Sequence, residues 1–210
     1  MNRLVACGAL IALALSGCAS APTHFYTLAA PLDAPATARP LQAPVYIEFA
    51  PLALPRRLAR PQMVLRSKGD ADSGAKVDVL EAYRWSSSFE FELRDALADG
   101  VARRLGAVNS TLAGRTPGQA AWRVLLQVGA FDAIEDERID VALNWTVRRT
   151  DRSETSACEW SASEAVGPGI DALAQGAQRV TSAAADAIAR HIAALEAKTA
   201  PDCMTRAGAP

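Results

Sequence analysis

The first residue whose surroundings indicate a reaction is Cys18. It ends the sequence Leu-Ser-Gly-Cys, directly after a 12-residue apolar run over residues 4–15. This run is shorter than the about 20 residues of a membrane-spanning helix, and Arg3 before it is typical of a secretory signal. Small residues before a cysteine let a lipoprotein signal peptidase reach the bond, and the sulfur receives diacylglycerol. We predict that residues 1–17 are a signal peptide and that Cys18 is lipidated.

The alternative for this region is ordinary secretion, with cleavage at the Ala-Ser-Ala sequence of residues 19–21. If Cys18 is lipidated, Ala19 favours the outer membrane, because in enteric-type sorting an Asp at that position would retain the protein on the inner membrane. We therefore expect a lipid-anchored protein at the periplasmic face of the outer membrane.

Cys158 and Cys203 are the thiols left after lipidation, since Cys7 leaves with the signal peptide. An oxidising compartment favours pairing them. Cys158 starts the last predicted strand and Cys203 follows the last predicted helix, so a disulfide would hold the C-terminal tail across the sheet. The alternative is a buried free thiol at Cys158 and a disordered end at Cys203. The distance between the two Cα atoms, about 7 Å at most for a bond, distinguishes them.

Other residues suited to catalysis are sparse. The two histidines, His24 and His191, have no Cys or His at metal-ligand spacing. The chain contains neither a Gly-x-Ser-x-Gly elbow nor a Gly-rich phosphate loop. The acidic residues 135–137 would suit a cation, but they stand where a hairpin must turn, so we interpret them as a solvated turn. We predict no catalytic residue, no metal and no cofactor; the protein is not expected to be an enzyme.

Three arginines, Arg56, Arg57 and Arg60, lie within five residues between Pro55 and Pro61. Guanidinium groups bind carboxylates and phosphates well. We predict that these arginines belong to a docking surface for a protein partner or for lipid phosphates; the alternative is a loop into a strand with incidental charge. The whole chain has 22 basic and 23 acidic residues, so it lacks the basic excess that nucleic-acid binding needs.

The predicted elements form one domain. Residues 18–43 are a Pro- and Ala-rich tether after the lipidated cysteine, interrupted by strand-forming residues 24–28, which we expect to dock on a sheet edge. Residues 44–198 form the domain and residues 199–210 a tail. Half of the chain is apolar, which is enough for a core.

Alternation of apolar and polar residues predicts two groups of strands, each closed by a helix. The first helix starts at a capping box of Ser87 and Glu90 and ends at Gly106, and the last covers about 171–197. Short polar connections favour antiparallel hairpins. We predict an α+β, two-layer sandwich: a mainly antiparallel sheet covered by two helices, in βββα-βββα order. The predicted strands are 45–49, 62–66, 77–83, 122–130, 139–147 and 158–162.

The sequence also resembles the PqiC/YmbA family of ABC-type transport auxiliary lipoproteins over nearly its whole length. The resemblance includes the lipobox, the Tyr-x-Leu of residues 26–28, the arginine stretch 54–66 and Arg84-Trp85. Its most specific part is Arg-Pro-Gln at 60–62. The chain departs from the family pattern at three places. Arg57 stands where the family usually has an aromatic residue, and Ala59 stands where it usually has Asp. Ser86-Ser87 stand where Glu-Pro is common.

This resemblance implies an auxiliary subunit of a system that moves lipids between the inner and outer membranes. The implied partner is a periplasmic transporter subunit with an MCE domain. Two further partners are compatible with this interpretation: a phospholipid, and a second copy of the chain in a homo-oligomer. The rival hypothesis is a structural lipoprotein that assists assembly of an outer-membrane complex, as LptE-like proteins do.

Overall fold

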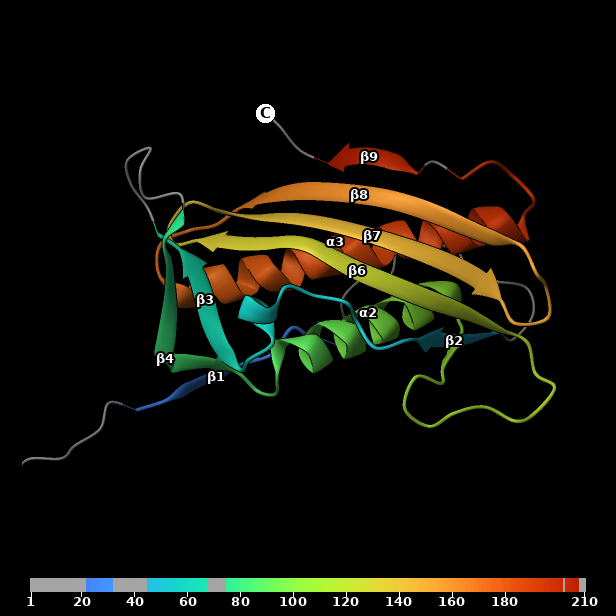
Figure 1. The fold of residues 1–210 in the computed structure, drawn as a ribbon, viewed down its shortest axis with the longest axis horizontal. Helices are drawn as coiled ribbons and strands as arrows, with labels where there is room; N and C mark the ends of the chain where they lie inside the picture. Colours follow the sequence, from blue (N-terminus) through green and yellow to red (C-terminus); the bar gives the residue numbers. More distant parts are fainter. Residues whose placement is uncertain (1–21, 32–44, 68–74, 202, 208–210) are drawn as a thin grey trace, which may run out of the picture.

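The structure, a computed structural model, describes residues 22–31, 45–67, 75–201 and 203–207. These residues form a nine-stranded mixed sheet with two helices on one face, so the predicted α+β two-layer class is confirmed (Figure 1). The predicted signal peptide, Cys18 and much of the predicted tether lie outside the described residues. The elements are β1 (His24–Tyr26), β2 (Tyr46–Phe49), η1 (Arg56–Leu58), β3 (Gln62–Arg66), β4 (Val77–Trp85), α2 (Phe89–Leu105), β5 (Val108–Asn109), β6 (Ala121–Ile134), β7 (Arg138–Arg149), β8 (Thr155–Ala165), α3 (Ile170–Glu196) and β9 (Met204–Ala207).

Three long strands form the centre of the sheet. β6 pairs antiparallel with β7, and β7 pairs antiparallel with β8, as their alternation predicted. The acidic residues 135–137 form the β6–β7 turn, where Asp136 takes a positive φ of 56° and accepts the Gly169 N–H at 2.8 Å. One side of each strand is buried, including Val124, Leu126, Ile139, Leu143, Trp145, Val147 and Trp160.

The first group of strands departs from the predicted hairpin order. β3 and β4 are antiparallel as expected, but β2 pairs with β6 in parallel, and β3 also lies parallel to β6. Between β2 and β3 the chain follows the edge of β6, where Ala53 bridges Gln127. Pro51, Pro55 and Pro61 cannot donate ladder hydrogen bonds, so this stretch does not fold back as a hairpin strand. Three short strands are absent from the predicted βββα-βββα order. Each pairs in parallel with a neighbour: β1 with β4, β5 with β2, and β9 with β8.

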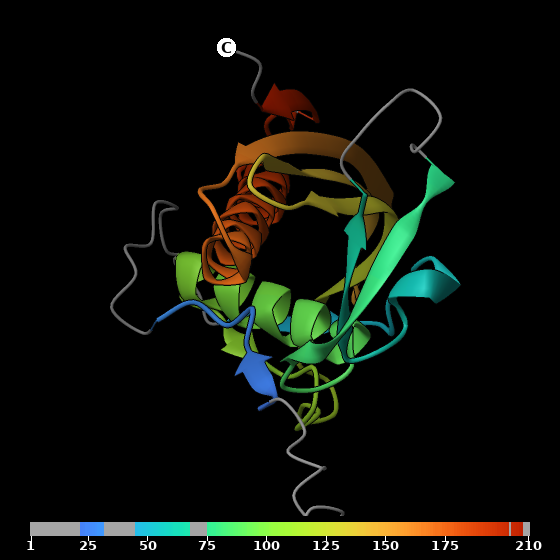
Figure 2. The same cartoon turned by 90° about the vertical axis from the view of Figure 1, so that its left-hand side faces the viewer.

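The helices α2 and α3 cross on the inner face of the sheet, which curves around them (Figure 2). The large apolar residues that repeat every four positions in α2, from Phe89 to Leu105, are all buried, and the apolar face of α3 is buried from Leu173 to Ile192. Gly100 permits their close approach, because a Cβ there would lie 2.8 Å from the Cβ of Ala185. In the described residues no helix combines the length and apolar character needed to cross a membrane.

The ends of α2 show one confirmed and one wrong prediction. Gly106 closes the helix in a left-handed conformation, and its N–H reaches the carbonyls of Ala102 and Arg103. The capping box is wrong: the N-cap residue is Ser88, which makes no side-chain capping bond. The Ser87 hydroxyl contacts Glu92 instead, at 3.4 Å.

Candidate functional site

Two surface segments carry the candidate functional residues: the N-terminal segment, residues 24–29, and the arginine segment, residues 54–66. The N-terminal segment begins with β1, which pairs with the edge strand β4 so that His24 lies opposite Tyr83. These two rings stack with centroids 5.2 Å apart. The predicted docking of this segment on a sheet edge is therefore confirmed.

Tyr26 connects the segment to the start of α3. Its hydroxyl donates to the carboxylate of Asp171 over 2.6 Å. Burial, and then the hydrogen bond to Asp171, raise the pKa of Tyr26 to about 12. The phenol therefore stays protonated, and remains a donor, throughout the physiological range of pH.

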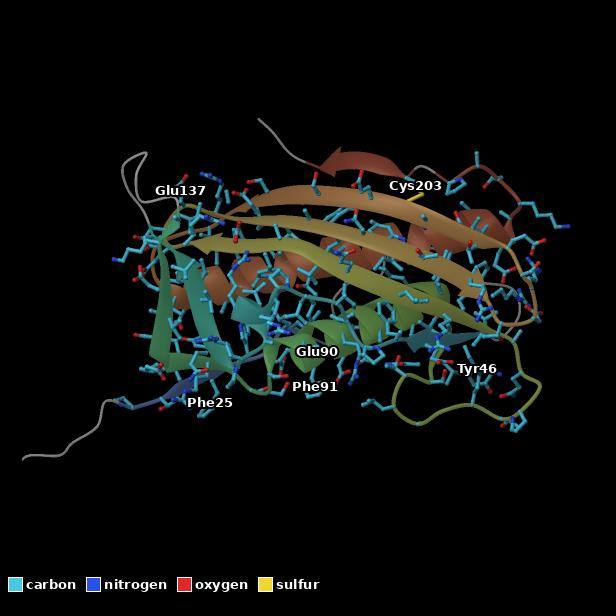
Figure 3. All side chains as sticks on the ribbon, in the orientation of Figure 1. Phe25, Tyr46, Glu90, Phe91, Glu137 and Cys203 are labelled. Atoms are coloured by element: carbon cyan, nitrogen blue, oxygen red, sulfur yellow. A yellow bond between two sulfur atoms is a disulfide. The ribbon has the colours of Figure 1, made fainter. Side chains whose placement is uncertain are left out.

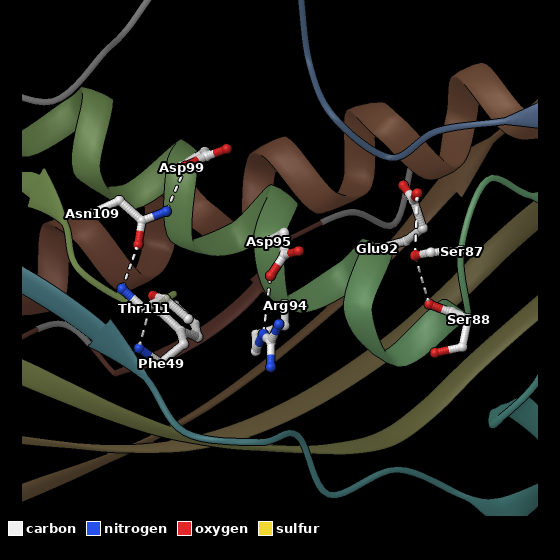
Figure 4. A network of polar contacts seen from close by, with 9 residues as sticks. All are labelled: Phe49, Ser87, Ser88, Glu92, Arg94, Asp95, Asp99, Asn109 and Thr111. Atoms are coloured by element: carbon white, nitrogen blue, oxygen red, sulfur yellow. Dashed lines mark hydrogen bonds and ion pairs between the residues drawn. The ribbon is translucent and has the colours of Figure 1, made fainter. Parts of the chain in front are cut away.

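Glu92, in the first turn of α2, holds the next two residues. It accepts hydrogen bonds from the Thr27 hydroxyl and the Leu28 N–H, each at 3.0 Å. It also accepts from the hydroxyl of Ser86. The hydroxyl of Ser87 contacts the same carboxylate (Figure 4). The serines that replace the family's Glu-Pro thus position this carboxylate. Sequence reasoning overlooked Glu92 because Thr27 and Leu28, which it holds, are 65 and 64 positions away in the chain.

Gln178 of α3 completes the attachment. Its amide donates to the carbonyls of Thr27 and Ala29, at 2.8 and 3.2 Å. Between these two carbonyls, Leu28 is only 1% exposed and lies in the core. The N-terminal segment is therefore held by β4, α2 and α3 together, as an integral part of the fold.

The arginine segment forms the single turn η1 and then β3. Leu58 is buried under it, and the carbonyl of Arg60 accepts the N–H of Phe89 at 3.2 Å, at the start of α2. The carbonyl of Pro61 accepts the Trp85 N–H at 2.7 Å. The backbone of the segment is thus held against the junction of β4 and α2.

The three predicted docking arginines have different surroundings. Arg57 donates to Asp132 of β6 at 3.0 Å, and Arg66 donates to the other oxygen of this carboxylate at 2.7 Å. Arg56 is exposed, and Arg60 is partly exposed, with a buried Nε that has no hydrogen-bond partner in the described part of the chain. Arg57 therefore belongs to an ion-pair cluster, whereas Arg56 presents its side chain to solvent. Asp132 was missed, although a charge inside an apolar strand was a signal for it.

A second polar cluster lies beneath β7 and β8. His191 of α3 is 2% exposed; its Nδ1 accepts the Trp145 indole N–H at 2.9 Å, and its Nε2 lies 2.8 Å from the Ser156 hydroxyl. Because an indole only donates, the neutral ring must carry its proton on Nε2. Burial lowers the pKa of His191. These contacts serve packing of α3 on the sheet.

Cys158 and Cys203 are joined in a disulfide, with their Cα atoms 4.9 Å apart (Figure 3). This distance lies inside the range that a disulfide requires. The two sulfurs and a ring nitrogen of His191 lie within 4.8 Å of one another, a set of metal-ligand types that sequence spacing did not reveal. In this oxidised form both thiols are used in the S–S bond, and Nδ1 is already an acceptor for Trp145.

Two hollows differ greatly in size. The cavity between the layers, lined by residues such as Met63, Phe89 and Leu173, has a volume of about 20 Å³, room for about one water molecule. An open hollow of about 630 Å³ lies on the outer side of the sheet, beside Leu125, Thr146 and Cys203. The inner cavity is therefore too small to enclose an acyl chain.

Residues 26–189 match the sequence model of a family described as ABC-type transport auxiliary lipoprotein component. The chain belongs to this family. The PqiC/YmbA resemblance is thus confirmed, and the match begins at Tyr26, inside the N-terminal segment. A comparison with curated proteins gave no match.

Two solved structures share the fold of this auxiliary lipoprotein. One, a crystal structure of an uncharacterized protein, is 17% identical, covers 82% of this chain and 99% of its own, and superposes with a TM-score of 0.63. The other, a Xanthomonas campestris protein of the family DUF330, is 12% identical, covers 85% of this chain and all of its own, with the same TM-score of 0.63. At these identities the likeness concerns the fold alone.

Proposed function

We propose that this auxiliary lipoprotein is anchored by Cys18 to the outer membrane, faces the periplasm and serves an MCE-type ABC system that moves lipids between the two membranes. The observation that carries the proposal is the family match over residues 26–189, which makes the chain an ABC-type transport auxiliary component. We propose no catalytic role for it. Residues 44–198 would act as one domain, to which the N-terminal segment of the predicted tether 18–43 and β9 of the tail 199–210 are attached.

The geometry favours a partner-binding role over a lipid carrier. The cavity between the layers, about 20 Å³, offers no room for an acyl chain. The arginine segment, by contrast, has a backbone fixed against α2 and an exposed guanidinium at Arg56. Because the backbone is already fixed, binding a carboxylate or phosphate there costs no further backbone entropy. We therefore retain Arg56 and Arg60 as docking residues for the MCE-domain subunit and assign Arg57 mainly to its ion pair with Asp132.

The experiment is capture of the periplasmic part of an MCE-domain transporter subunit from the same organism. We expect the double variant Arg56→Gln/Arg60→Gln to bind at least tenfold more weakly, with an unchanged melting temperature. The matched control is Arg148→Gln/Arg152→Gln, which removes the same charge from an exposed site at the other end of β7. Equal weakening by both variants would show that only net charge matters, and no capture by the parent protein would contradict the proposed partner.

A further inference from the structure

The chain between Cys18 and the folded domain is short. β1 begins at His24, six positions after the cysteine. A fully extended chain advances at most about 3.6 Å per residue, so the Cα atoms of these two residues cannot be more than roughly 20 Å apart. If Cys18 carries the lipid, as the proposed function requires, the bilayer must lie within this reach of β1.

The N-terminal segment, where this link joins the domain, is firmly attached to the rest of the fold. β1 pairs with β4, Tyr26 donates to Asp171, and Glu92 and Gln178 bind the two residues that follow. These four attachments to three elements hold the N-terminal segment to the domain. The segment therefore cannot detach and lengthen the link to Cys18. The limit on the distance between Cys18 and β1 therefore also limits how far the folded domain can lie from the lipid anchor.

The domain is larger than this reach, so its orientation is restricted. α3 has 27 residues, which corresponds to about 40 Å at 1.5 Å per residue. Figures 1 and 2 both place β1 at the lower side of the molecule and β8 and β9 at the upper side. With Cys18 within this reach of β1, the side that carries β1 lies nearest the bilayer, and the β8–β9 side, which is opposite it in both views, points away.

Phe25 is the residue that this side presents. It is 65% exposed, although it is a large apolar side chain in a paired strand. Successive side chains of a strand point to opposite faces, and His24 and Tyr26 on either side of it both stack on Tyr83. Phe25 therefore points away from that ring cluster, and Figure 3 shows it at the lower edge of the molecule.

The surroundings of Phe25 favour an apolar contact over an electrostatic one. The neighbouring strand β4 carries charges of both signs: Arg84, opposite Phe25 in the β1–β4 pair, and Glu81, its ion-pair partner at 3.5 Å. A second exposed aromatic, Phe91 at 47%, lies in the first turn of α2 next to Glu92. Exposed Phe, Trp and Leu side chains of interfacial proteins bury at the boundary between lipid headgroups and acyl chains, where the apolar surface leaves water.

We propose that Phe25 inserts into the headgroup layer of the membrane that holds the lipid anchor. The N-terminal segment thereby forms a second membrane contact, which sets the domain with β1 down and β8–β9 toward the periplasm. This proposal rests on the proposed lipidation of Cys18 and deepens it by naming the face and the residue that meet the lipid.

The test uses the acylated mature protein in phospholipid vesicles that contain lipids brominated near the glycerol end of the chains. Phe25→Trp places a reporter at the contact, while the native tryptophans are all buried and at most 6% exposed. The control is Leu125→Trp, at a site 49% exposed on the outer side of the sheet, away from the helices that hold β1. After the emission of the four native tryptophans, measured on the parent protein, is subtracted, we expect the emission of the added tryptophan to be blue-shifted and quenched at least twofold in Phe25→Trp. We expect neither change in Leu125→Trp.

Each other outcome overturns the proposal. Equal quenching of the two reporters, or none at Phe25→Trp, would contradict the orientation while leaving lipidation intact. A blue shift of Phe25→Trp before vesicles are added would show that a second copy covers this site. Failure of the acylated protein to float with vesicles would contradict both this inference and the anchoring in the proposed function.

Discussion

Cys158 and Cys203 stand within bonding distance although 45 positions separate them in the chain. Closing a loop of this length is worth roughly 4 kcal/mol in the chain-entropy model. We expect the purified, unfolded and unreduced mature protein to show no free thiol while keeping a monomeric mass. Thiol titration measures this directly, and two free thiols per chain would contradict the bond.

His191 makes the free energy of unfolding depend on pH. Burial holds its pKa below the ordinary 6.5, so the folded chain keeps the ring neutral where the unfolded chain protonates it. The unfolded state then binds more protons, and stability decreases as the pH is lowered through about 6.5. Between pH 7.5 and 5, we expect urea unfolding to show a loss of up to about 2 kcal/mol that is missing in His191→Gln. Identical pH dependence in the two proteins would assign the effect to other groups.

At the scale of elements, the N-terminal segment depends on one carboxylate. In Glu92→Ala the Leu28 N–H keeps its buried position but loses its acceptor, which costs about 1–3 kcal/mol locally. We expect hydrogen exchange at the Leu28 amide to be at least about fivefold faster. Glu90→Ala removes the same charge two residues earlier in the same helix turn and should leave this exchange rate unchanged. Equal exchange in both variants would show that β1 pairing alone holds the segment.

α2 and α3 can approach closely where they cross because residue 100 is a glycine and has no side chain. Gly100→Ala would bring a Cβ to within 2.8 Å of Ala185, so one helix must shift. We expect the free energy of unfolding to decrease by about 1–3 kcal/mol, the usual cost of overpacking. In the control Gly167→Ala the added Cβ meets Ala172 at 3.6 Å, an ordinary contact, and stability should be nearly unchanged. Chemical denaturation compares the two, and a neutral Gly100→Ala would mean that the helices separate easily.

At the scale of the whole molecule, location depends on Cys18, which lies outside the described residues. Lipoprotein signal peptidase acts only after the cysteine has been modified, so Cys18→Ala should accumulate as an uncleaved precursor that is not acylated. Labelling cells with a radioactive fatty acid tests this, with Cys7→Ala as the control that should label normally. Incorporation of label into Cys18→Ala would refute the lipobox assignment.

Local patterns were sufficient for the elements themselves. The apolar repeat of α2 and the alternation of β6 and β7 predicted their type and nearly their bounds, because each pattern reports which side of one segment is buried. The left-handed end at Gly106 followed from the same local reasoning. Local reasoning did not identify the N-cap residue of α2. Ser87, Ser88 and Glu90 all suit a helix start, and which serine caps the helix depends on tertiary contacts such as that of Ser87 with Glu92.

Sequence by itself therefore determined the two layers, the long hairpins and the family, since these rest on periodicity and on motifs of neighbouring residues. Only the tertiary structure decided that β2 and β3 both pair with β6 in parallel. It alone brought Glu92 to Leu28, 64 positions away, and Arg57 to Asp132, 75 positions away. It also placed His191 beside the disulfide. Such contacts depend on how whole elements pack against one another, and no periodicity within a single segment encodes the partner of a side chain on another one.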